Sequence, residues 1–172
     1  YDREPDTLSR PWVFPGTPGM EHRLGGLEKQ PVTGTVSYAP EDHAAMCQQR
    51  AQKVERIAGF IPELEVTGQQ QGDLLVLSWG GSYGAAVTAV QRVNRKGLSV
   101  GHAHLRYLNP FPRNLGDVLD RYDKVMIPEL NSGQLGLLVR ARYLREVVPL
   151  PKLQGQPFSV SEIEAKIEEL LA

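Results

Sequence analysis

The chain has 172 residues, of which 41% are hydrophobic and 23% are charged, and its formal net charge is -1. This composition is typical of a globular protein, and the length allows one ordinary domain with an extension. A nearly neutral charge gives no electrostatic reason to expect a nucleic acid or an anionic membrane as a partner, and no apolar run approaches the roughly 20 residues that span a bilayer.

The first 36 residues are dense in glycine and proline and show no period of 2 or 3.6, which predicts an irregular arm. The arm contains no basic segment followed by an apolar one, so we expect no signal peptide. Because the chain begins at Tyr1 and its opening is rich in proline and glycine, we interpret it as a piece of a longer polypeptide. The single cysteine, Cys47, excludes an internal disulfide and any site with four cysteine ligands from this chain, and it is consistent with a cytoplasmic location.

A helix is predicted over "APEDHAAMCQQRAQKVERIAGF", residues 39–60. Pro40 suits the first turn of a helix, and the two acidic residues that follow it suit the positive end of the helix dipole. Cys47 lies on the apolar side of this helix, so we expect a buried and inert thiol. The predicted apolar stripe consists of Cys47, Ala51, Val54, Ala58 and Ile61.

From residue 71 onward, strand-like and helix-like stretches alternate with short turns between them. This order predicts an α/β fold, with a mostly parallel sheet of about four to five strands and helices on both faces. Ser161 and Glu164 match a capping box at the start of the last helix. We therefore expect an arm and helix over residues 1–70 and an α/β domain over residues 71–172. The predicted strands are 73–79, 98–107, 124–130 and 147–150, and the predicted helices are 83–97, 112–122, 132–146 and 159–171.

The glycine-rich turn from Gly80 to Gly84 lies between the first strand and the first helix of this domain. A dinucleotide fingerprint would need a glycine at Trp79 and an acid at the end of the second strand, and neither is present. We expect a tight turn, and a free-standing nucleotide- or flavin-binding module of flavodoxin-like shape is the alternative. A hydrolase with Ser82 as nucleophile is disfavoured, because no histidine follows the later acidic residues in the chain.

The carboxyl ends of parallel strands meet at one sheet edge, where ligands and partners usually bind. Asn131, Ser132 and Glu129 could instead cap the helix that follows the third strand. His102 and His104 alternate along a strand, and we favour packing against a helix over metal binding, because no third ligand is near in sequence. The residues expected in these edge loops, as interface or carboxyl-edge positions, are Ser82, Tyr83, Arg106, Tyr107, Asn109, Glu129, Asn131 and Gln134.

Several of these stretches, in this order, resemble the alpha subunit of 2-oxoacid:ferredoxin oxidoreductases, especially the 2-oxoglutarate type. The domain from residue 71 is similar to the C-terminal domain of transketolase-like thiamine diphosphate enzymes. The motifs that carry the resemblance are "PGTPGMEHRLGGLEK" (15–29), "TGTVSYAPEDHAAM" (33–46), "RAQKVERIA" (50–58), "LRYLNPFP" (105–112), "PELNSGQL" (128–135) and "QGQPF" (154–158).

The resemblance implies an enzyme complex that oxidatively decarboxylates a 2-oxoacid, reduces ferredoxin and forms an acyl-CoA. It implies that thiamine diphosphate, Mg²⁺ and an iron–sulfur cluster belong to the beta subunit and an earlier alpha domain, so this chain holds no cofactor or metal and has no catalytic residue or activity alone. Its partners would be the beta subunit, ferredoxin, CoA and the 2-oxoacid, within an oligomer without nucleic acid or membrane. His22 and Arg23 are the expected substrate-proximal residues, with Arg23 suited to pair with a distal carboxylate.

Overall fold

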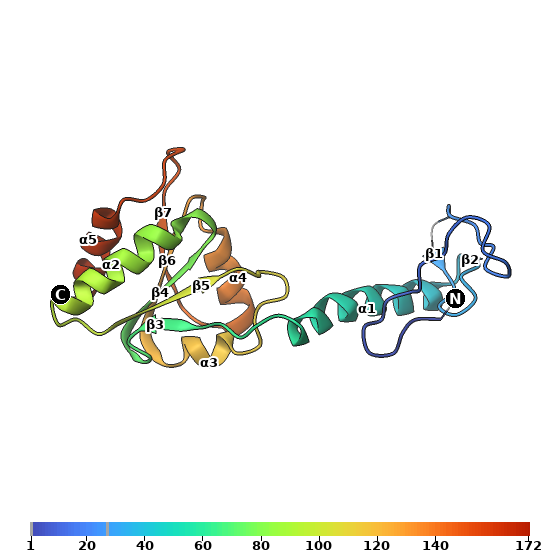
Figure 1. Cartoon of the computed structure of the whole chain (residues 1–172), viewed down its shortest axis with the longest axis horizontal. Coiled ribbons are helices and arrows are strands. Elements are labelled where there is room, and N and C mark those ends of the chain that lie inside the picture. Colours follow the sequence, from blue (N-terminus) through green and yellow to red (C-terminus); the bar gives the residue numbers. More distant parts are fainter. Residues whose placement is uncertain (1, 27) are drawn as a thin grey trace. The chain divides into compact units, whose positions relative to one another are not determined.

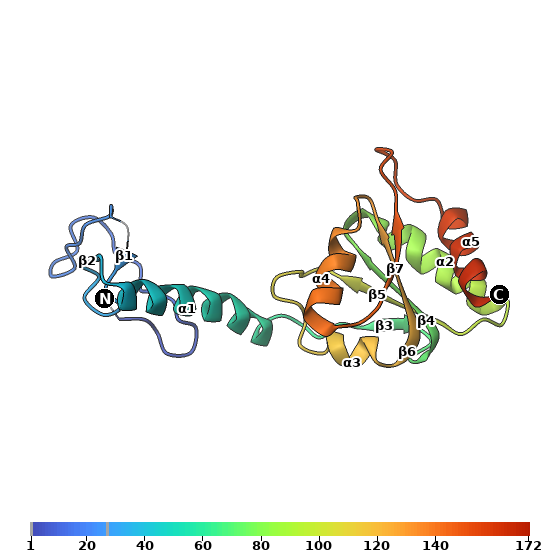
Figure 2. The ribbon, with the colours of Figure 1, turned by 180° about the vertical axis from the view of Figure 1, so that it is seen from behind.

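The computed structural model describes residues 2–26 and 28–172 and divides into two compact units, one that ends at Ile61 and one that covers Pro62–Ala172 (Figures 1 and 2). The division falls before the predicted boundary at residue 70. The reason is a strand that the sequence did not reveal, β3 (Val66–Gly68), which pairs with the sheet of the second unit.

The first unit is an irregular arm that leads into a helix. Its regular elements before the helix are β1 (Glu28–Lys29) and β2 (Val36–Ser37), which pair in antiparallel. Helix α1 (Pro40–Arg56) follows, and a 3₁₀ turn, η1 (Ile57–Gly59), ends it. The helix begins at Pro40 as predicted, where the missing N–H of proline costs no intrahelical bond.

The predicted apolar stripe is only partly buried, with Val54, Ala58 and Ile61 half-buried. Met46 is buried on this helix, whereas Cys47 and Ala51 are exposed. The helix packs against β1, a strand of two residues. The helical spacing of the pattern is correct, but the pattern does not tell whether another element covers that face. The Cys47 thiol is exposed, and the expectation that it is buried is wrong.

The second unit contains a five-stranded sheet in the order β3-β5-β4-β6-β7. All neighbouring strands are parallel except β3, which runs antiparallel to β5 at one edge. The predicted α/β class and the mostly parallel sheet are confirmed. The strands are β4 (Gly72–Trp79), β5 (Val100–Leu105), β6 (Tyr122–Glu129) and β7 (Val148–Pro151), and the helices are η2 (Gly80–Ser82), α2 (Tyr83–Arg95), α3 (Leu115–Leu119), α4 (Gln134–Tyr143) and α5 (Val160–Leu171).

Helices cover both faces of this sheet (Figures 1 and 2). On one face, α2 and α5 pack over Leu74, Val76 and Met126. On the other face, α3 and α4 pack over Leu75 and Leu77. Alternate residues of β4 thus enter two separate apolar cores, which explains why the strand is apolar along almost its whole length.

The last helix is capped two residues earlier than predicted. Glu162 accepts the N–H of Ser159 at 2.7 Å, and its own N–H donates to the Ser159 hydroxyl. Because α5 begins at Val160, Ser161 already lies inside the helix, and the predicted Ser161–Glu164 box is wrong. Glu164 instead accepts a hydrogen bond from the ammonium group of Lys96, the residue directly after α2, at 2.6 Å.

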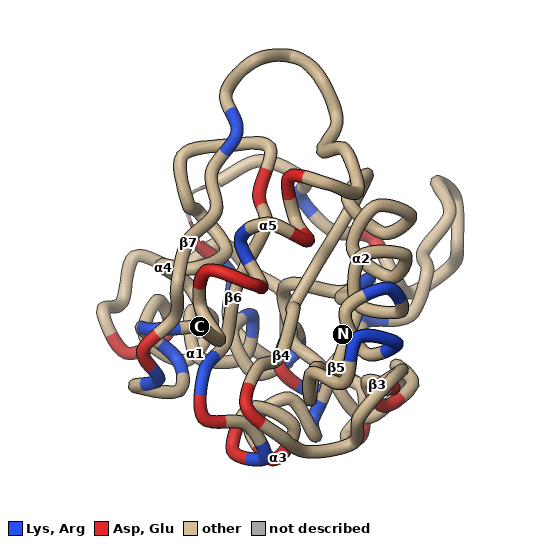
Figure 3. The backbone as a smooth tube through the Cα atoms, turned by 90° about the vertical axis from the view of Figure 1, so that its left-hand side faces the viewer, with Lys and Arg blue, Asp and Glu red and all other residues tan. Residues whose placement is uncertain are grey.

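Acidic and basic residues are interspersed along both units, with neither sign confined to one of them (Figure 3). Within residues 2–26 and 28–172, no helix has the length and apolar character needed to cross a lipid bilayer.

Candidate functional site

A polar cluster lies inside the second unit near the carboxyl ends of β4 and β5. Ser78 and His104 are direct partners across these two parallel strands, and His102 lies two residues before His104 on the same side. The Ser78 hydroxyl lies 2.8 Å from Nε2 of His102 and 2.8 Å from Nδ1 of His104. A hydroxyl has one proton to donate, so it donates to one ring and the other ring donates to its oxygen.

Tyr83, the first residue of α2, covers this cluster from the helix side. Its ring centroid lies 5.7 Å from that of His102 and 5.0 Å from that of His104, the second pair in an edge-on arrangement. On the strand side, the Thr67 hydroxyl lies 3.3 Å from Nδ1 of His102. The histidines thus pack against a helix, as favoured from the sequence, and both ring nitrogens of His102 have partners.

A hollow of about 230 Å³ opens over the cluster. Its wall combines aromatic rings and two histidines with one cation, Arg106, and two carboxylates that precede β3. This composition suits a polar group of a ligand or of a neighbouring protein surface. The lining residues are Pro62, Glu63, Leu64, Glu65, Thr67, Tyr83, His102, His104, Arg106, Tyr107 and Pro112.

Both histidines are held in the neutral form. Burial, with a smaller contribution from His104, lowers the pKa of His102 to about 4 from its usual 6.5. Burial and then the nearby charge of Arg106 also lower the pKa of His104. At neutral pH the pair therefore adds no positive charge to the hollow.

His102 should make the chain sensitive to mild acid. The unfolded chain binds a proton at His102 below pH 6.5, whereas the folded chain does so only below about pH 4. The contribution of His102 to the free energy of unfolding is therefore fully present above pH 6.5 and is lost as the pH falls from 6.5 to about 4. The shift corresponds to at most about 3 kcal/mol of the free energy of unfolding. Urea unfolding at pH 7, 6, 5 and 4.5 should show this fall in the wild type. We expect a smaller fall in His102→Gln; equal falls in the wild type and in this variant would contradict the assignment.

The residues predicted for the sheet edge separate into two groups. Tyr83, Arg106 and Tyr107 line the hollow, and Asn109 is exposed on the loop that follows. Ser82 is not available at this edge, because it is 2% exposed and its hydroxyl donates to the carbonyl of Trp79 at 2.7 Å. It closes the glycine turn, which corrects its expected placement among the open edge loops.

Glu129 ends β6, Asn131 lies in the turn that follows, and Gln134 begins α4. The carboxylate of Glu129, 1% exposed, accepts the N–H groups of Leu135 and Gly136 at 2.7 and 2.9 Å. The side chain of Asn131 accepts the N–H of Gln134 at 3.0 Å. Glu129 and Asn131 thus cap the N-terminus of α4, as the alternative interpretation of the sequence expected. The Gln134 side chain is exposed to solvent.

The arm residues lie within the first unit. Nδ1 of His22 is 2.9 Å from the carbonyl oxygen of Met20, and the Arg23 carbonyl accepts the Lys29 ammonium group. The Arg23 side chain is exposed. Glu63, Glu65 and Thr67 also line the hollow, although the sequence did not point to them. The short strand β3, which carries Thr67, has no alternating pattern that would reveal it.

Residues 72–163 match the family model of the pyruvate:ferredoxin oxidoreductase core domain II. The chain is 47% identical, over its whole length, to the 2-oxoglutarate oxidoreductase subunit KorA of Mycobacterium tuberculosis, of which it covers 26%. Its fold matches the 2-oxoglutarate:ferredoxin oxidoreductase of Magnetococcus marinus, solved with 2-oxoglutarate, coenzyme A and succinyl-CoA bound, with a TM-score of 0.90 and 30% identity over the whole of this chain and 30% of that one.

A split-gene transketolase, an inactive beta4 tetramer, shares the fold over 62% of this chain and 41% of its own, with a TM-score of 0.50 at 15% identity. The present chain spans about a quarter to a third of the length of the two oxidoreductases.

Proposed function

The chain belongs to the pyruvate:ferredoxin oxidoreductase core domain II family, and from this premise we propose that it forms part of the alpha subunit of a 2-oxoglutarate:ferredoxin oxidoreductase. The observation that carries the proposal is the match along the whole chain to two relatives whose names specify 2-oxoglutarate. Family membership also favours this function over the alternative of a free-standing flavodoxin-like module.

The complete enzyme would convert 2-oxoglutarate and CoA to succinyl-CoA and CO₂ while two electrons pass to ferredoxin. Thiamine diphosphate supplies the carbanion chemistry of such a decarboxylation, and an iron–sulfur cluster supplies the one-electron steps. The residues of this chain do not fit either group. A cluster with four cysteine ligands needs more than Cys47, and the turn at Gly80–Gly84 lacks the spacing of a phosphate loop, with its Ser82 hydroxyl bonded to Trp79.

We therefore assign thiamine diphosphate, Mg²⁺ and the cluster to the beta subunit and to an alpha domain that precedes this chain in the complete protein. The domain from Pro62 would act as a scaffold, with Tyr83, Arg106 and Asn109 as its contacts to neighbouring domains or subunits. The arm would extend the thiamine-site domain, with His22 and the exposed Arg23 near the substrate. We place the complex in the cytoplasm, as an oligomer with the beta subunit that passes electrons to ferredoxin.

An omission assay tests this function. Full-length alpha and beta subunits are mixed anaerobically, and the reduction of a low-potential viologen dye is followed by absorbance. We expect reduction only when 2-oxoglutarate, CoA and both subunits are present, because each supplies a reactant or a cofactor site. Reduction that proceeds equally well without CoA or without the alpha subunit would contradict the proposal.

A further inference from the structure

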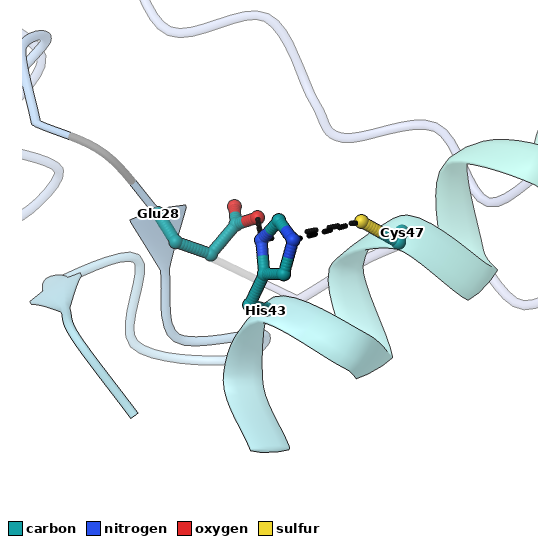
Figure 4. A group of neighbouring side chains, drawn as sticks. All are labelled: Glu28, His43 and Cys47. Carbon is teal, nitrogen blue, oxygen red and sulfur yellow. Dashed lines mark hydrogen bonds and ion pairs between the residues drawn. The ribbon is translucent and has the colours of Figure 1, made fainter. Parts of the chain in front are cut away.

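Three side chains with metal-binding atoms lie together in the first unit, apart from the site described above (Figure 4). Glu28 comes from β1, and His43 and Cys47 come from α1. The two helix residues are four positions apart and therefore lie on the same face. One ligand atom from each of the three residues lies within 4.8 Å of the others.

The distances come near those around a tetrahedral ion. Nδ1 of His43 lies 3.1 Å from Oε2 of Glu28, and Sγ of Cys47 lies 4.0 Å from Nδ1 and 3.6 Å from Nε2 of the same ring. Ligand atoms bound to a tetrahedral zinc ion at about 2.0–2.3 Å lie about 3.3–3.8 Å from each other. Because the sulfur lies nearer to Nε2, the exposed His43 and Cys47 side chains must rotate to bring the sulfur and Nδ1 onto one ion. Carboxylate, imidazole and thiolate are the ligand types of zinc, and three of them leave a fourth position for water.

A cation already lies at this place. The guanidinium of Arg50 donates to both carboxylate oxygens of Glu28, at 3.3 and 3.2 Å, and to Sγ of Cys47 at 3.3 Å. Chiefly through these bonds from Arg50, the pKa of Glu28 is lowered to about 2, so its carboxylate is ionised at neutral pH. The Arg50 side chain is 52% exposed and can rotate into solvent. The Glu28 carboxylate thus attracts positive charge, and its present cation is displaceable.

We propose that Glu28, His43 and Cys47 bind a divalent metal ion of the zinc class, which competes with the Arg50 guanidinium for the carboxylate and the sulfur. Binding breaks the S–H bond of Cys47, releases that proton to solvent and forms the metal–sulfur bond, without any change of oxidation state. The bound ion joins β1 to α1 and so stabilises the first unit. This site is independent of the oxidoreductase function proposed above.

Cobalt absorption spectroscopy tests the site directly. Co²⁺ is titrated into the reduced 172-residue chain, where a thiolate-to-cobalt charge-transfer band can come only from Cys47, the single cysteine. We expect one equivalent to bind and excess Zn²⁺ to displace it. The band should vanish in Cys47→Ser, and the affinity should fall at least about tenfold in His43→Gln, as is usual when a metal site loses a supporting group.

The Arg50→Gln variant separates a metal site from a purely structural ion-pair cluster. Removing the competing cation should raise the Co²⁺ affinity about tenfold, since a monovalent and a divalent cation a few ångströms apart repel each other. Lys53→Gln is the matched control, because it removes an exposed positive charge from the same helix and should leave the affinity unchanged. A missing charge-transfer band in both the wild type and Arg50→Gln, or weaker binding in Arg50→Gln than in the wild type, would overturn the proposal.

Discussion

Replacing Glu129 by alanine is expected to lower the free energy of unfolding by about 3 kcal/mol, because two buried N–H donors lose the carboxylate that accepts them. Glu129 ends β6, and its carboxylate accepts the N–H groups of Leu135 and Gly136 in the first turn of α4. An unsatisfied buried donor costs about 1–3 kcal/mol. The negative charge also lies at the positive end of the helix dipole, which adds to the loss.

Urea unfolding followed by circular dichroism measures this effect. Glu129→Gln keeps one acceptor oxygen and should lose about half as much free energy as Glu129→Ala. Glu146→Ala is the matched control, because its side chain is 92% exposed and the change should stay within about 0.5 kcal/mol. If Glu129→Ala unfolds like the wild type while the full-length subunit fails to assemble with its beta partner, the carboxylate serves an interface and not the helix.

Gly101→Ala should be at least as damaging, with an expected loss of about 3 kcal/mol or more. A Cβ at Gly101 would lie 2.2 Å from Oη of Tyr122 and 2.6 Å from the carbonyl oxygen of Gln69. Tyr122 cannot move away freely, because its hydroxyl donates to that same Gln69 carbonyl at 2.5 Å. The added methyl group therefore meets both a fixed ring and the backbone within the sheet.

Two further variants serve as controls for Gly101→Ala. Gly81→Ala adds the same methyl group where nothing lies within 4 Å, and it should change the free energy of unfolding by less than about 0.5 kcal/mol. Gly101→Ala combined with Tyr122→Leu removes the ring contact but keeps the Gln69 carbonyl, so it should be less destabilised than the sum of the two single variants. Equal stability of Gly101→Ala and Gly81→Ala would show that the ring does not lie over Gly101.

The parallel sheet could be predicted from the sequence because local and tertiary preferences agree there. β4 and β6 contain apolar runs, and each connection between the strands contains a helix with buried apolar residues. β3 could not be predicted, because a strand of three residues is too short to show an alternation of apolar and polar residues. Its position depends on pairing with β5, which is distant in the sequence.

The errors in the sites have the same origin. The apolar spacing around Cys47 is helical, but whether that face is buried depends on what packs against α1, and β1 is too short to cover it. Ser82 was placed at the correct turn, yet its hydroxyl satisfies the backbone of Trp79. His102 and His104 contact Ser78 and Tyr83. These contacts depend on the register of β4 with β5 and on the position of α2, which the sequence pattern does not specify.

The central claim, that this chain is part of a 2-oxoglutarate-type enzyme, is tested most directly by substrate preference in the complete complex. The value of kcat/KM for dye reduction is measured with 2-oxoglutarate and with pyruvate, at saturating CoA. We expect a preference for 2-oxoglutarate of at least about 100-fold, because a site that pairs a distal carboxylate leaves its polar groups unpaired with pyruvate. Equal values, or a preference for pyruvate, would contradict the assignment.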